Sequence, residues 1–136
     1  MTKRYANTAM IYAIIAMITG VFYREFTKFN GYTAPTRLSV MHTHYFLLGM
    51  FFFLILMLLE KAFQITGRQT GKILLTYHLG LNITALGFLL RGLTQVLATP
   101  LSKGIDAAIS GISGIGHILL GVSLILLLLQ IKKRAE

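Results

Sequence analysis

The side chains best able to do chemistry in this sequence are its four histidines, His42, His44, His78 and His117. The chain has no cysteine, which excludes disulfides, thiolate metal sites, iron–sulfur clusters and haem attached through a C-x-x-C-H motif. Asp and Glu together number only four. A metal or cofactor would therefore be held mainly by histidine, with methionine, tyrosine and the few carboxylates as the remaining ligands.

These histidines lie in or beside apolar stretches of membrane length. The chain is 55% hydrophobic and 12% charged, and its mean hydropathy is +0.71. Apolar runs of about 18–20 residues are typical of transmembrane helices. We expect four spans, at about 6–23, 40–59, 73–97 and 107–131, with a polar loop of about sixteen residues between the first two. The sequence therefore predicts one domain, an all-α integral membrane four-helix bundle in the lipid bilayer.

Lys and Arg are distributed unevenly between the two expected sides of the membrane. The N-terminus, the connector between the second and third spans and the C-terminus hold eight of the 13, and the other two loops hold four. The positive-inside rule then predicts that both termini are cytoplasmic. Although the net charge is +9, there is no soluble basic surface, so we expect no nucleic-acid partner.

Two of the histidines are expected at the same depth in the bilayer. The second span descends from the outer side and places His44 roughly 6 Å inside it, at 1.5 Å per residue. Counting back about 20 residues from Ile131 places His117 at roughly 7 Å, whereas His78 falls in the inner third. Two level imidazoles on two helices of a bundle are the arrangement that axial ligation of a b-type haem requires.

Small residues near the expected ligands would leave space for a flat macrocycle. Gly114 and Gly121 lie one turn on either side of His117 on one helix face. The third span has a second small face, made of Gly80, Thr84 and Gly87. Both faces predict room for a haem between the third and fourth spans.

Arg91 lies at the outer end of the third span, where the propionates of a haem at this depth would lie. An arginine inside a span requires an anionic partner, and the expected spans contain no Asp or Glu. We therefore expect Arg91 to pair with a propionate.

The role of the two remaining histidines is open. Side chains at i and i+2 point about 200° apart on a helix, so His42 and His44 cannot easily bind one metal ion, which weighs against a transition-metal site. Depth favours His44 as the haem ligand, whereas the small residue Gly49 on the His42 face favours His42. For His78 a core hydrogen bond is favoured over a second ligand site or a proton relay.

The sequence resembles known protein families in two ways, one local and one over the whole chain. The segment His42-Thr43-His44-Tyr45 is similar to the His-x-His-Tyr element of the haem–copper oxidase main subunit, where neighbouring histidines bind two different haems. It implies one haem b, or two, but not oxygen reduction, because the other histidines of a copper centre are missing. The whole chain resembles an uncharacterised family of small, basic, four-span bacterial membrane proteins, which implies a multi-pass protein of the bacterial cytoplasmic membrane.

The sequence favours a bis-histidine b-type haem protein that acts in electron transfer, haem handling or sensing, with a quinol or another membrane redox protein as partner. With one histidine ligand, the iron would be open to peroxide, oxygen or nitric oxide, as in a haem-dependent membrane oxidoreductase. Two alternatives stay open: a non-enzymatic membrane helper or assembly subunit, and a zinc or copper carrier. A homodimer is one expected form, because four short helices leave little interior around a cofactor.

Overall fold

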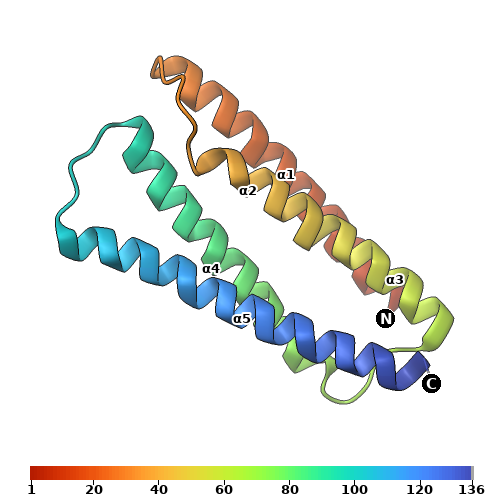
Figure 1. Cartoon of the computed structure of the whole chain (residues 1–136). Helices are drawn as coiled ribbons and strands as arrows, with labels where there is room; N and C mark the ends of the chain where they lie inside the picture. Colours follow the sequence, from red (N-terminus) through yellow and green to blue (C-terminus); the bar gives the residue numbers. More distant parts are fainter. Residues whose placement is uncertain (136) are drawn as a thin grey trace.

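The structure is a computed structural model that describes residues 1–135, and it confirms an all-α chain (Figure 1). Helix α1 spans Thr2–Phe29. The second long helix is continuous through α2 (Leu38–His44), the π-helical segment η1 (Tyr45–Phe51) and α3 (Phe52–Phe63). Helices α4 (Thr70–Val96) and α5 (Lys103–Ala135) complete the chain. Each of the four long helices is long and apolar enough to cross a membrane.

The helices form two antiparallel pairs. Helix α1 packs along α2, η1 and α3, and α4 packs along α5, while α2 contacts α4 and α3 contacts α5 between the pairs. Both termini lie at one end of the bundle, which we call the terminal end (Figure 1). The connectors from α1 to α2 and from α4 to α5 lie at the other end, which we call the loop end. The two termini thus lie at the same end of the bundle, as an even number of antiparallel long helices requires.

The helices are longer than the expected spans, and the expected sixteen-residue loop is wrong. Helix α1 continues past the last residue of the first expected span to Phe29 and leaves a connector of eight residues, 30–37. Residues 24–29 contain no glycine or proline, and the helix ends only before Gly31, whose φ is +62°. Apolarity marks the part of a helix that suits lipid, whereas the backbone stays helical until a residue breaks it.

Close packing of small residues joins α4 to α5. A Cβ atom on Gly80 would lie 2.5 Å from the backbone nitrogen of Leu120, and one on Gly116 would lie 2.5 Å from that of Thr84. Glycines allow helix backbones this close an approach. The expectation that Gly80, Thr84 and Gly87 leave space for a macrocycle is therefore wrong, because α5 fills that face.

The π-helical segment is held by aromatic residues of α1 and α4. The ring of Tyr12 lies against Gly49, where an added Cβ would come within 2.6 Å of the ring. The Tyr77 hydroxyl donates to the Leu48 carbonyl at 2.8 Å. Such wide turns are uncommon and often lie beside functional residues. This one begins directly after His44.

Candidate functional site

A cavity of about 480 Å³ lies between α2, α4 and α5 at the loop end of the bundle. Its volume is within the range of about 300–1,000 Å³ typical of ligand and cofactor sites. The cavity is lined by two arginines, two histidines, two serines and three apolar residues: Arg37, Val40, His44, Phe88, Arg91, Ile109, Ser110, Ser113 and His117. Three of these, His44, Arg91 and His117, are residues that the sequence singled out.

The structure brings His44 and His117 together across this cavity. Their ring centroids are 6.2 Å apart and their planes are nearly perpendicular, at 85°. His44 is half-buried on α2, and His117 is exposed on α5. The close approach agrees with the equal depth expected for these two residues.

Each of these imidazoles is hydrogen-bonded to its own helix. The Nδ1 atom of His44 lies 3.1 Å from the Val40 carbonyl oxygen, and that of His117 lies 2.7 Å from the Ser113 carbonyl oxygen. A carbonyl oxygen only accepts, so each Nδ1 carries the proton and donates it. Each Nε2 is then left with its lone pair. Histidines that bind metals in proteins are usually held in this way, with the other ring nitrogen donating to a carbonyl or carboxylate.

The distance between the rings also suits one metal ion between them. An imidazole nitrogen binds a metal at about 2.0 Å, so two imidazoles on opposite sides of one ion have centroids roughly 6 Å apart. Rings that share one axis can also turn about it, so perpendicular planes are compatible with this arrangement. The donor pair therefore fits axial ligation of a haem iron.

Phe88 of α4 restricts one edge of the gap between the imidazoles. Its ring centroid is 4.8 Å from that of His44 and 5.8 Å from that of His117, closer than the two imidazoles are to each other. A macrocycle centred between the imidazoles fits only if this ring turns aside. A Cβ on Gly114 or Gly121 would meet no atom within 4 Å, so both glycines border open space. Both glycines thus lie beside His117 on its open side and not in the cavity lining.

Arg91 is paired within the protein, so the expectation that it lacks a protein anion is wrong. One guanidinium nitrogen, Nη1, donates to the Asp106 carboxylate. The other, Nη2, lies 3.1 Å from the Asp106 carbonyl oxygen and 2.9 Å from the Ser110 hydroxyl. The reason is that α5 begins at Lys103, about one turn before the expected span, and so places Asp106 on the helix that faces Arg91.

Arg37 also lines the cavity, although the sequence indicates only a positive charge in the first loop. It immediately precedes α2, its side chain lines the cavity, and it is exposed. Its backbone N–H donates to the Gln95 side chain at 2.9 Å, which fixes the start of α2 against α4. The i, i+3, i+7 spacing of Arg37, Val40 and His44 could have revealed that they share a face.

His42 lies against α1, not in the cavity. A Cβ on Gly20 would be 3.6 Å from the Cβ of His42. The Nδ1 atom of His42 is buried with no hydrogen-bond partner among the described residues. His42 and His44 thus face different helices, and the position of His42 gives no support to it as the partner of His117.

His78 belongs to a separate polar cluster. Its ring stacks on Phe53 with centroids 4.9 Å apart, and its Nδ1 lies 2.6 Å from the Tyr12 hydroxyl. This agrees with the favoured expectation of a core hydrogen bond. Within residues 1–135 no group of three or more His, Asp or Glu side chains is placed to hold a metal ion.

A family profile described as "Protein of unknown function (DUF2871)" matches residues 2–134. No curated protein and no solved structure matches the chain, so the likeness to haem–copper oxidases rests on the four residues 42–45 alone.

Proposed function

We propose that this chain, which belongs to the family of proteins of unknown function DUF2871, is a membrane protein that binds b-type haem between His44 and His117. Its four long helices would cross the bilayer, because each has the length and apolar composition of a span. The excess of Lys and Arg at the terminal end favours cytoplasmic termini. The cavity would then lie in the outer half of the membrane.

One observation carries this proposal: two imidazoles from different helices face each other across a cavity with both Nδ1 atoms already bonded. Ionisable side chains inside spans are rare and usually functional. If His44 and His117 only packed, nothing would require both rings to border one cavity with Nδ1 bonded and Nε2 left as an acceptor. Mutual hydrogen bonding is not available either, because each Nε2 is an acceptor in this arrangement.

Two arginines at the loop end of the cavity, Arg37 and Arg91, are placed where they could bind the haem propionates. Arg37 is the main candidate for binding a propionate, because its exposed guanidinium lines the cavity. Arg91 is held in place by Asp106 and Ser110, so its position is fixed although its charge is balanced. Arg is well suited to carboxylates, since its planar donors bind both oxygens at once.

The role that fits two histidine ligands is electron transfer or haem handling. A haem b held by both His44 and His117 would supply reversible one-electron chemistry rather than bind a substrate at the iron. The protein would orient the ligands through the Val40 and Ser113 carbonyls. A zinc or copper carrier is less favoured, because the described residues contain no cluster of three ligands.

An absorption spectrum tests the proposal. The protein purified in detergent from haem-replete cells should show a Soret band, and a sharp α band after reduction, with one haem per chain. His117→Ala and His44→Ala should each lose the bis-histidine spectrum. His42→Ala is the matched control and should keep it. A colourless preparation, or a spectrum that survives both ligand substitutions, would overturn the proposal.

A further inference from the structure

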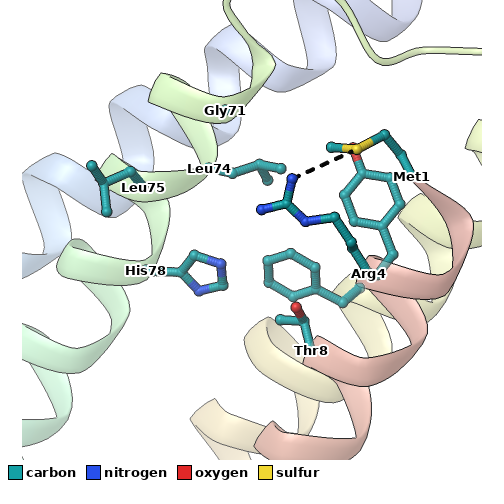
Figure 2. A pocket seen from close by; sticks show the side chains of 9 residues that line it. Met1, Arg4, Thr8, Gly71, Leu74, Leu75 and His78 are labelled. Carbon is teal, nitrogen blue, oxygen red and sulfur yellow. Dashed lines mark hydrogen bonds between the residues drawn. The ribbon is translucent and has the colours of Figure 1, made fainter.

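A groove between α1 and α4 contains the second polar cluster of the molecule. Two cavities, of about 200 and 350 Å³, share Thr8 and His78 and together make up this groove. Figure 2 shows its part nearer the terminal end, where Thr8 and Arg4 of α1 lie opposite His78 and Leu74 of α4. The other part is lined by Ile11, Tyr12, Ile15 and Asn82. None of these residues belongs to the His44–His117 cavity.

The hydrogen bonds of the cluster allow the proton on His78 to be assigned. The Tyr45 hydroxyl donates to Asn82 Oδ1 at 3.0 Å, and Asn82 Nδ2 donates to the Tyr12 oxygen at 3.3 Å. Among the described residues the Tyr12 hydroxyl proton has no acceptor other than His78 Nδ1, 2.6 Å away, so we assign Nδ1 as the acceptor of this bond. Neutral imidazole carries one proton, so in His78 that proton is on Nε2.

His78 therefore has the opposite tautomer from His44 and His117. Those two rings offer a lone pair at Nε2, whereas His78 offers an N–H, which suits an oxygen acceptor and not a metal ion. The His78 ring is fixed by stacking on Phe53 at 4.9 Å and 3° and on Tyr12 at 5.6 Å and 23°. An N–H donor inside a span is costly without an acceptor, and its position beside the groove identifies where an acceptor would bind.

The depth of His78 limits what the acceptor can be. Lys72 marks the polar end of α4, and His78 lies six residues further along, roughly 9 Å deeper at 1.5 Å per residue. Ester carbonyls of phospholipids stay near the headgroups and would not reach this level. A small lipid-soluble ring that carries a carbonyl and an apolar tail would reach it. The exposed side chain of Ile11 at the edge of the groove would contact such a tail.

We propose that the α1–α4 groove binds the ring of a membrane quinone, with His78 Nε2–H donating to one quinone carbonyl. Thr8 lines both cavities together with His78, and its hydroxyl would be a second donor to the quinone. The site is made of residues other than the haem ligands, so it exists whether or not haem is bound.

Photolabelling tests this site. The protein in nanodiscs is irradiated with an azido-substituted benzoquinone, and the labelled peptides are mapped by mass spectrometry. Label should concentrate in residues 8–15 and 74–82 and be displaced by excess unlabelled decyl-benzoquinone. His78→Phe keeps an aromatic ring but removes the N–H, and it should reduce groove labelling roughly five- to tenfold, the effect of one lost hydrogen bond. His42→Phe, outside the groove, should label like the unmodified protein.

If His78→Phe does not fold, a second variant, Ile11→Trp, tests the same site. The side chain of Ile11 is 55% exposed, so Ile11→Trp should fold and block the groove. Label that is spread over all lipid-facing segments, or that neither variant reduces, would overturn the proposal. The absorption spectrum of the same samples separates the two proposals. Specific groove labelling of a colourless protein would support the quinone site and overturn the haem proposal. A haem spectrum without groove labelling would support the haem proposal and overturn the quinone site.

Discussion

The guanidinium of Arg91 on α4 donates to both the carboxylate and the backbone carbonyl oxygen of Asp106, in the first turn of α5. The charge of Arg91 is therefore balanced inside the protein, next to the cavity that holds His44 and His117. The uncompensated positive charge on the cavity lining comes from Arg37. This arrangement determines how the electrostatics of the site should respond to substitution.

Substitutions of these charges should shift the reduction potential of the proposed haem in opposite directions. Asp106→Asn adds net positive charge near the iron, which favours the reduced form, and should raise the midpoint potential by some tens of millivolts. Arg37→Gln should lower it by a similar amount. Redox titration of the α band measures both. Shifts of the same sign in the two variants would contradict the proposed placement of the haem.

Phe88→Leu should make the cavity easier to fill. The smaller side chain removes the ring that restricts one edge of the gap between the imidazoles, so the proposed haem should bind the apoprotein several-fold faster. Stopped-flow measurement of the Soret band gives the rate. Leu86→Ala, an exposed position on the same helix, is the control and should leave the rate unchanged. A slower rate in Phe88→Leu would mean that the ring helps to hold the haem.

Gly80→Ala should destabilise the α4–α5 pair. The added methyl would lie 2.5 Å from the Leu120 backbone, and backbone cannot move aside as a flexible side chain can. Overpacking of this kind costs about 1–3 kcal/mol. Thermal unfolding followed by circular dichroism in detergent should show a lower midpoint.

Gly111→Ala is the matched control for that experiment. An added Cβ there meets nothing within 4 Å, and alanine favours the helix over glycine by roughly 0.5–1 kcal/mol. Its unfolding midpoint should be unchanged or higher. Equal effects of the two substitutions would show that the close approach of α4 and α5 is not what stabilises the pair.

Tyr77→Phe should loosen the π-helical segment. Tyr77 is buried and its hydroxyl donates to the Leu48 carbonyl, so the variant should lose about 0.5–1.5 kcal/mol of unfolding free energy. Backbone amides of residues 45–51 should exchange hydrogen faster. Tyr23→Phe, on α1, is the control and should show neither change. Unaltered exchange in Tyr77→Phe would mean that the segment holds its geometry without this bond.

Fusion reporters should show both termini in the cytoplasm. A green fluorescent protein fused to either terminus should fluoresce, because it folds poorly after export through the usual secretion route. A cysteine placed at Thr33, in the connector between α1 and α2, should react with an impermeant maleimide added to intact cells. The reverse pattern would invert the bundle and put the cavity in the inner half of the membrane.

The sequence by itself determined which segments are helical and that His44 and His117 can meet. Apolar length fixes four long helices, and a constant rise per residue places two imidazoles at one level on the second and fourth helices, which run in the same direction. Both follow from local geometry, which a sequence contains. The helix ends were less predictable, because they depend on where the backbone is broken and not on where apolarity ends.

Only the tertiary structure decided which helix faces are buried and which are open. From sequence, the small face of α4 could border either a cofactor or another helix. The structure shows that it packs against α5, through Gly80 and Gly116. Arg91 could have required an outside anion, and the early start of α5 supplied Asp106 instead. His42 and His44 could not be ranked from spacing, because the choice depends on the rotation of α2 between α1 and α5. That rotation is set by contacts between helices distant in the chain, such as Tyr12 against Gly49, which no local pattern encodes.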